Sequence, residues 1–130
     1  MKIESVDLVR VAMPLVLPFR TSFGTQTARD ALLVRVKGPD ADGWGECVAM
    51  NEPLYSAEYV DGAQDVIERF LLPRLMGAAD VSAERVAGDL ADVKGHPMAK
   101  AAVEMAILDA ELCARGESLA AYLGAVAESV

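Results

Sequence analysis

The chain has 130 residues, of which 53% are hydrophobic and 25% are charged, and its formal net charge is -8 at pH 7. This length fits a single domain with a core of its own, and the acidic balance excludes a surface for nucleic acid or anionic lipid. No apolar run reaches the roughly 18 residues of a membrane span, and the N-terminus lacks the apolar core of a signal peptide, so we expect a cytoplasmic protein.

The first part of the sequence carries the patterns of β-strands. Residues 3–13 are rich in Val, Leu and Ile, and Pro14 limits how far this strand can pair. In residues 32–37 every second side chain is Leu or Val, which is the period of a half-buried strand, and residues 44–49 are its expected partner. Residues 38–43, rich in Gly, Asp and Pro, have the chemistry of a hairpin loop. The pattern predicts three strands in an antiparallel meander.

Two irregular connections are expected beside these strands. Residues 14–25 form a connection too long and too aromatic for a simple turn, and residues 49–55 lead from the third strand into the first helix. Long loops in compact domains usually carry function. We therefore treat these two connections as the candidate functional segments.

The second part of the sequence carries helical patterns. Apolar residues recur at helical spacing from residue 57 to 71, in a helix that we expect Ser56 to cap and Pro73 to kink or end. Ser82 is the expected cap of a second helix with Gly95 just past its end. Pro97 suits the first turn of a third helix that Gly116 closes, and a short helix follows at residues 119–123. Strands followed by helices predict an α+β fold, a three-stranded antiparallel sheet followed by three to four helices.

The helix over residues 97–112 is apolar on nearly every side, and such a helix is expected to be buried all round. Few other elements are available to cover it, so we expect part of its covering to come from a neighbouring domain. Asp109 lies among apolar residues of this helix and needs a partner, in this chain or in that neighbour. Lys100 and Glu104 have the spacing of an i,i+4 ion pair.

Motifs for self-sufficient chemistry are not complete in this sequence. Residues 43–46 (Gly-Trp-Gly-Glu) lack the third glycine of a dinucleotide fingerprint, and glycines in a strand more often mark close backbone approach. Residues 40–51 match three positions of a calcium loop but end in Asn51, where the bidentate Glu belongs. His96, the one histidine, is expected to cap a helix or face solvent. Cys47 and Cys113 are expected to be reduced, packed thiols.

Four segments in the same order as in one known family carry a resemblance. They are residues 18–24 (Pro-Phe-Arg-Thr-Ser-Phe-Gly), 43–47 (Gly-Trp-Gly-Glu-Cys), 52–58 (Glu-Pro-Leu-Tyr-Ser-Ala-Glu) and 97–106 (Pro-Met-Ala-Lys-Ala-Ala-Val-Glu-Met-Ala). Together they resemble the N-terminal capping domain of the enolase superfamily. The chain is most similar to the group of N-acylamino acid racemases and o-succinylbenzoate synthases.

The resemblance implies a sheet followed by helices that covers the mouth of a TIM-type barrel. In that family a barrel lysine removes the proton alpha to a substrate carboxylate, and Mg²⁺ on three barrel carboxylates stabilises the enediolate. The barrel and its Mg²⁺ site would lie outside residues 1–130. The resemblance therefore implies no catalytic residue and no metal ligand in this chain, and an inactive domain when it is alone.

The resemblance also carries over the substrate-facing side chains of the cap. Apolar groups from the two connections would surround the variable end of an N-acylamino acid or of the succinylbenzoate precursor, and two hydroxyls would add polar contacts. The expected apolar residues are Phe19, Phe23, Met50 and Tyr55, and the expected polar residues are Thr21 and Ser22. The alternative is that the four apolar side chains fill the local core.

Two functions remain open at this point. The first is the capping domain of a racemase or synthase, whose partners are a small carboxylate substrate and a catalytic barrel. The second is a stand-alone binding or assembly module that uses the same fold and buries its long helix in a homo-oligomer.

Overall fold

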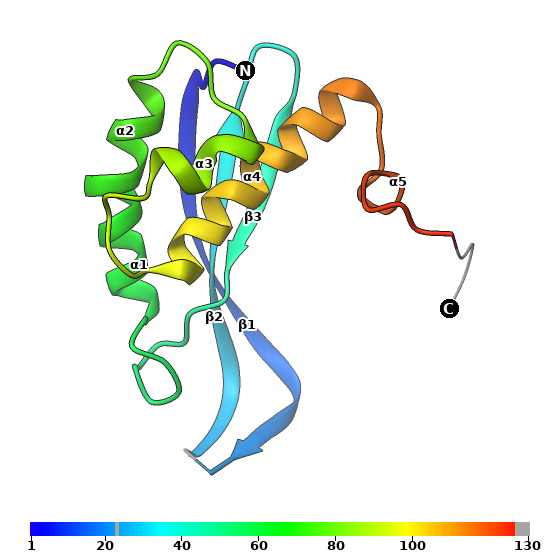
Figure 1. Ribbon diagram of the computed structural model, residues 1–130. Helices are drawn as coiled ribbons and strands as arrows, with labels where there is room; N and C mark the ends of the chain where they lie inside the picture. The colour runs from blue at the N-terminus through cyan, green and yellow to red at the C-terminus, as the bar shows by residue number, and fades with distance from the viewer. Residues whose placement is uncertain (23, 127–130) are drawn as a thin grey trace.

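The computed structural model describes residues 1–22 and 24–126, and it has the predicted α+β architecture. Three strands form one antiparallel sheet in the order β1-β2-β3, which confirms the predicted meander. Helices α1 to α4 lie together on one face of this sheet (Figure 1). The strands are β1 (Ser5–Thr21), β2 (Gly24–Lys37) and β3 (Asp42–Cys47).

The first two strands are much longer than predicted. Residues 14–25 were expected to form an irregular connection, but β1 runs on through them and pairs with β2 as far as Thr21 and Gly24. The pairing register shifts between Pro14 and Phe19, and this irregularity accommodates Pro14 and Pro18, which have no N–H to donate. An edge strand tolerates such prolines, and β1 is an edge strand. The ends of β1 and β2 therefore form an arm, residues 14–22 and 24–28, that extends past the helices (Figure 1).

The first helical segment begins later than predicted, and of the two outcomes expected at Pro73, a kink or an end, the helix does not end there. Its N-cap is Tyr59 and not Ser56, and it continues beyond Pro73. A π-helical turn precedes Pro73, and its wider turn removes the usual clash between a proline ring and the carbonyl of the fourth residue before it. The segment consists of α1 (Val60–Val66), the π-turn η1 (Ile67–Leu71) and α2 (Leu72–Met76).

The remaining helices are α3 (Ala83–Asp89), α4 (Pro97–Arg115) and α5 (Leu119–Tyr122). Ser82 is the N-cap residue of α3, as predicted, but its side chain makes no cap hydrogen bond, and Gly116 ends α4 with a φ of 62°. Helix α3 is shorter than expected, because residues 90–93 form tight three-residue turns well before Gly95. None of the helices in the described ranges is long and apolar enough to cross a membrane.

Helix α4 packs against β3 at very short range. A Cβ atom on Gly43 would overlap the backbone of Ala106 and Ala110, and one on Gly45 would overlap the carbonyl oxygen of Ala102. Both glycines therefore serve close backbone approach, as the sequence predicted. The alanines recur every four residues along α4, which leaves a smooth face for β3.

This chain alone does not bury α4 on every side, and the expectation that a neighbouring domain covers the remainder stays a prediction. Ala101 and Glu104 are exposed, and Met105 keeps 42% of its surface exposed. The chain covers only the face that meets β3 and the other helices. That buried face consists of Ala99, Ala102, Val103, Ala106, Ile107, Ala110 and Leu112.

Two polar side chains of this region, Asp109 and Lys100, have partners that the sequence did not reveal, and His96 caps the helix only through its backbone. The carboxylate of Asp109 accepts a hydrogen bond at 2.8 Å from the backbone N–H of Trp44, so its partner lies within the chain at the free edge of β3. The Nζ of Lys100 donates to the carbonyl oxygen of Val93 and not to Glu104. The half-buried His96 is the N-cap residue of α4 but contributes only its backbone, because its side chain makes no cap hydrogen bond.

Candidate substrate-binding groove

A groove of about 370 Å³ lies between the arm and the loop that follows β3. One wall is formed by Thr21, at the end of β1, and by the first half of β2. The other wall is the start of the loop formed by residues 50–58 (the 50–58 loop). The lining residues are Thr21, Gly24, Thr25, Gln26, Thr27, Ala28, Arg29, Asp30, Met50, Asn51, Glu52 and Leu54.

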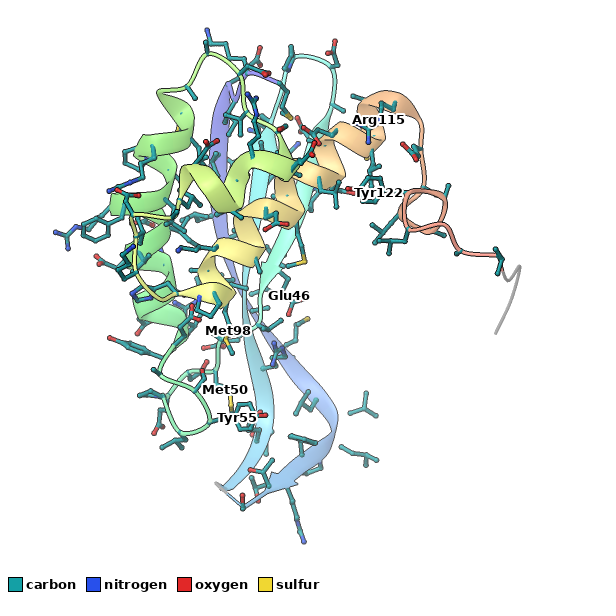
Figure 2. All side chains as sticks on the ribbon, in the orientation of Figure 1. Glu46, Met50, Tyr55, Met98, Arg115 and Tyr122 are labelled. Atoms are coloured by element: carbon teal, nitrogen blue, oxygen red, sulfur yellow. The ribbon has the colours of Figure 1, made fainter. Side chains whose placement is uncertain are left out.

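The 50–58 loop is held at its first residue. The carbonyl oxygen of Met50 accepts a hydrogen bond at 2.8 Å from the N–H of Val60, and Met50 pairs with Tyr59 in an isolated bridge. Figure 2 shows the side chains of Met50 and Tyr55 beside the arm, on the loop below α1 and α4. The loop therefore presents its side chains toward the arm from a fixed starting point.

The predicted substrate residues divide into three groups. Thr21 and Met50 line the groove together. Phe19 and Tyr55 lie on the arm and the 50–58 loop with 59% and 76% of their surface exposed, and Ser22 is exposed at the turn of the arm. These three do not line the groove, and Phe23 lies outside the described residues. The exposure of Phe19 and Tyr55 rules out the alternative that these two fill the core.

The polar wall of the groove was not found from the sequence. Arg29 joins the arm to β3 and to the following loop, since its Nη2 donates to Glu46 at 3.3 Å and to the carbonyl oxygen of Val48 at 3.5 Å. Asp30 lies 3.6 Å from the guanidinium of Arg10. These residues lie between the expected connection, residues 14–25, and the expected strand, residues 32–37, in a stretch to which no element was assigned. The threonines at positions 25 and 27 were the available signal, because β-branched residues favour strands.

The groove has the groups for binding but not for a metal. The described residues contain no group of three His, Cys, Asp or Glu side chains that could hold a metal ion. The lining combines apolar Met50 and Leu54 with hydroxyl, amide and charged groups from the other wall. A concave site of this composition suits a ligand with an apolar part and a polar part.

The last residue of the 50–58 loop carries a buried carboxylate. Glu58 is only 8% exposed, and its two oxygens accept hydrogen bonds from the N–H groups of Met98, at 2.8 Å, and Ala99, at 3.0 Å. These N–H groups belong to the first turn of α4, where a negative charge is favourable. Sequence analysis quoted Glu58 within a motif but assigned it no role.

The two cysteines differ in environment and, we predict, in reactivity. Burial raises the pKa of the Cys47 thiol, and the charges of Glu58 and Glu46 add to this effect. A hydrogen bond with the backbone of Ala49 partly opposes it. A raised pKa lowers the thiolate fraction at neutral pH, while Cys113 is exposed. In the folded chain at pH 8 we expect a thiol reagent such as DTNB to modify Cys113 rapidly and Cys47 only after unfolding.

Two variants check this assignment. Cys113→Ser should abolish the rapid reaction and Cys47→Ser should leave it unchanged. Rapid modification of Cys47 in the folded Cys113→Ser variant would contradict the buried position of β3 against α4.

Comparison with known proteins places this chain in a family. The family model described as "Mandelate racemase / muconate lactonizing enzyme, N-terminal domain" matches residues 3–124. An N-succinylamino acid racemase from Amycolatopsis sp is 57% identical over 130 residues, which are 100% of this chain and 35% of that protein. An o-succinylbenzoate synthase from Bacillus subtilis (strain 168) is 32% identical over 130 residues, which are 99% of this chain and 35% of that protein.

The structural comparison agrees with the sequence comparison. The crystal structure of an enolase-superfamily member from Listeria innocua Clip11262 superposes with a TM-score of 0.94 at 32% identity, over 100% of this chain and 35% of that chain. The present chain thus spans about a third of the length of the relatives that it matches.

Proposed function

Because the chain belongs to the mandelate racemase / muconate lactonizing enzyme N-terminal domain family of the enolase superfamily, we propose that it is the capping domain of an enzyme that removes the proton alpha to a carboxylate. The reaction is N-acylamino acid racemisation or the dehydration that forms o-succinylbenzoate. The names of the relatives from Amycolatopsis sp and Bacillus subtilis support these two reactions. In this proposal the catalytic barrel is a separate domain outside residues 1–130.

The groove between the arm and the 50–58 loop is the observation that supports a capping role. It is an open surface site on the part of the sheet that the helices leave uncovered (Figure 1). Met50 and Leu54 offer apolar area to an acyl or aromatic substituent, and Thr21 offers a hydroxyl nearby. Phe19 and Tyr55 stand exposed on the same two elements, where a second domain placed against the groove would enclose them.

The chemistry of the cap in this proposal is binding, orientation and exclusion of water. Closing a wall over a bound substrate removes water from the reacting centre and holds the substrate in one orientation, and both effects raise the rate of the chemical step. The Mg²⁺ ion of the family does not fit the described residues, which offer no set of three ligands. We therefore assign the metal to the barrel and no step of its chemistry to this chain.

Joining the chain to a catalytic domain tests the proposal. We expect the 130-residue chain alone to show no racemisation of an N-succinylamino acid in the presence of Mg²⁺. Fused ahead of the C-terminal part of the Amycolatopsis racemase, in place of that enzyme's own N-terminal domain, it should support turnover. The parent racemase, rebuilt with its own N-terminal domain across the same junction, is the control.

Two outcomes would contradict the proposal. One is turnover by the isolated chain, and the other is an inactive fusion beside an active control. A stable dimer of the isolated chain in light scattering, together with an inactive fusion, would favour the stand-alone assembly module instead.

A further inference from the structure

Glu58 is the one charged side chain that is buried among residues 1–22 and 24–126. Burying a carboxylate is costly unless hydrogen bonds compensate for the lost water. Here both oxygens are used, one by the N–H of Met98 and the other by the N–H of Ala99. The N-cap residue His96 makes no side-chain cap hydrogen bond, so Glu58 takes the place of a local cap at this end of α4.

The residues around Glu58 connect this cap to the groove. The hydroxyl of Ser56 donates to the carbonyl oxygen of Glu58 at 3.1 Å and lies 3.9 Å from the sulfur of Met98. Figure 2 shows Met98, at the start of α4, above Met50 in the view. The last residues of the 50–58 loop are thus tied to α4, while Met50 is tied to Val60 at the start of α1.

Helix α4 provides a rigid support for this link. Its backbone is in contact with Gly43 and Gly45 of β3, so it cannot shift toward the sheet. The other groove wall belongs to the same sheet, because β2 pairs with β3. The contacts through β3, α4 and the two hydrogen bonds of Glu58 therefore fix the position of the 50–58 loop relative to β2.

We propose that Glu58 is a positioning residue for the groove, one that sets the distance between the 50–58 loop and the arm without touching the ligand. This inference rests on the proposed function, in that the groove receives the variable part of the substrate. A loop that is released from α4 should bind this part more weakly and leave the reacting centre in the barrel unchanged. The signature is a change in KM and not in kcat.

The test is Glu58→Gln in the fusion with the Amycolatopsis catalytic domain. Glutamine keeps the size of the side chain, but its NH₂ group replaces one acceptor and faces an N–H of α4. We expect KM for an N-succinylamino acid to rise about tenfold and kcat to change less than about twofold. The matched control is Glu84→Gln, an exposed carboxylate in the first turn of α3, which should leave both constants unchanged.

A readout on the 130-residue chain is independent of turnover. In hydrogen exchange, Glu58→Gln should speed exchange of the amides of Met98 and Ala99 and of residues 51–57, and leave β2 and β3 protected. If Glu58→Gln does not fold, Ser56→Ala tests the proposal in its place. This variant removes the hydrogen bond from Ser56 to the carbonyl oxygen of Glu58 and leaves the buried carboxylate intact. We expect this variant to raise KM about threefold.

The outcomes separate the two proposals. If the fusion that carries the unchanged domain is inactive, the proposed function is refuted. Hydrogen exchange on the isolated chain then still tests whether Glu58 holds the 50–58 loop to α4. An active fusion in which Glu58→Gln or Ser56→Ala leaves KM unchanged, or in which kcat falls with KM constant, overturns the positioning role. Equal effects of Glu58→Gln and Glu84→Gln overturn it as well.

Discussion

Gly45→Ala is expected to lower the free energy of unfolding by about 3 kcal/mol or more, because the added methyl group has no space. Its Cβ atom would overlap the carbonyl oxygen of Ala102, and the neighbouring N–H of Ala106 is also within contact. Both are backbone atoms of α4, so the conflict cannot be relieved by rotating a side chain. Urea denaturation followed by circular dichroism measures the change.

Gly88→Ala is the matched control for this substitution. Gly88 lies in α3, and no atom lies within 4 Å of a Cβ placed on it. An alanine there should leave stability unchanged or raise it by up to about 1 kcal/mol, since glycine is a poor helix former. A Gly45→Ala variant as stable as Gly88→Ala would show that α4 and β3 are further apart than described.

Ile107→Ala is expected to cost about 2 to 5 kcal/mol of stability, because a large buried side chain is replaced by a small one and leaves a cavity. Ile107 is fully buried in the core cluster that also contains Leu32 and Leu71. Met105→Ala, two residues earlier on α4, should cost less than about 1 kcal/mol, because Met105 is 42% exposed.

The contrast between the two α4 variants measures which face of the helix the chain itself covers. Thermal and urea unfolding of the isolated domain provide both values. A loss with Met105→Ala as large as that with Ile107→Ala would mean that the Met105 face is also buried, for example by self-association. In the fusion with a catalytic domain, comparison of the same pair would show whether the second domain covers Met105.

Patterns that act within one element were predicted well. The alternation in residues 32–37 placed that part of β2 correctly. The glycines of β3 indicated close backbone approach, and in the structure the element that approaches is α4. Such features follow from side-chain periodicity and size, which a sequence shows directly. The α+β order of elements followed for the same reason.

Features that depend on a partner elsewhere in the chain were missed. Pro14 was expected to limit the pairing of the first strand, but an edge strand with a register shift continues past it. Asp109 had no visible partner, because the free N–H of Trp44 exists only once β3 forms the other edge. The role of Glu58 was missed for the same reason, because this residue caps a helix that begins about forty residues later along the chain.

The candidate site shows the same division. The family resemblance supplied Thr21 and Met50 as neighbours in the groove, and the structure brings these two together. Residue pattern alone supplied none of the polar wall of β2, because that wall depended on the long pairing with β1. Arg29, which braces this wall against β3, was therefore not anticipated.

The arm has one further consequence. Residues near its end, such as Val16, Leu17 and Phe19, are exposed and contribute nothing to the buried core. Point mutations there can change the exposed surface of the arm next to the groove at almost no cost in folding free energy. A domain built in this way can acquire new ligand preferences in small evolutionary steps while its scaffold stays intact.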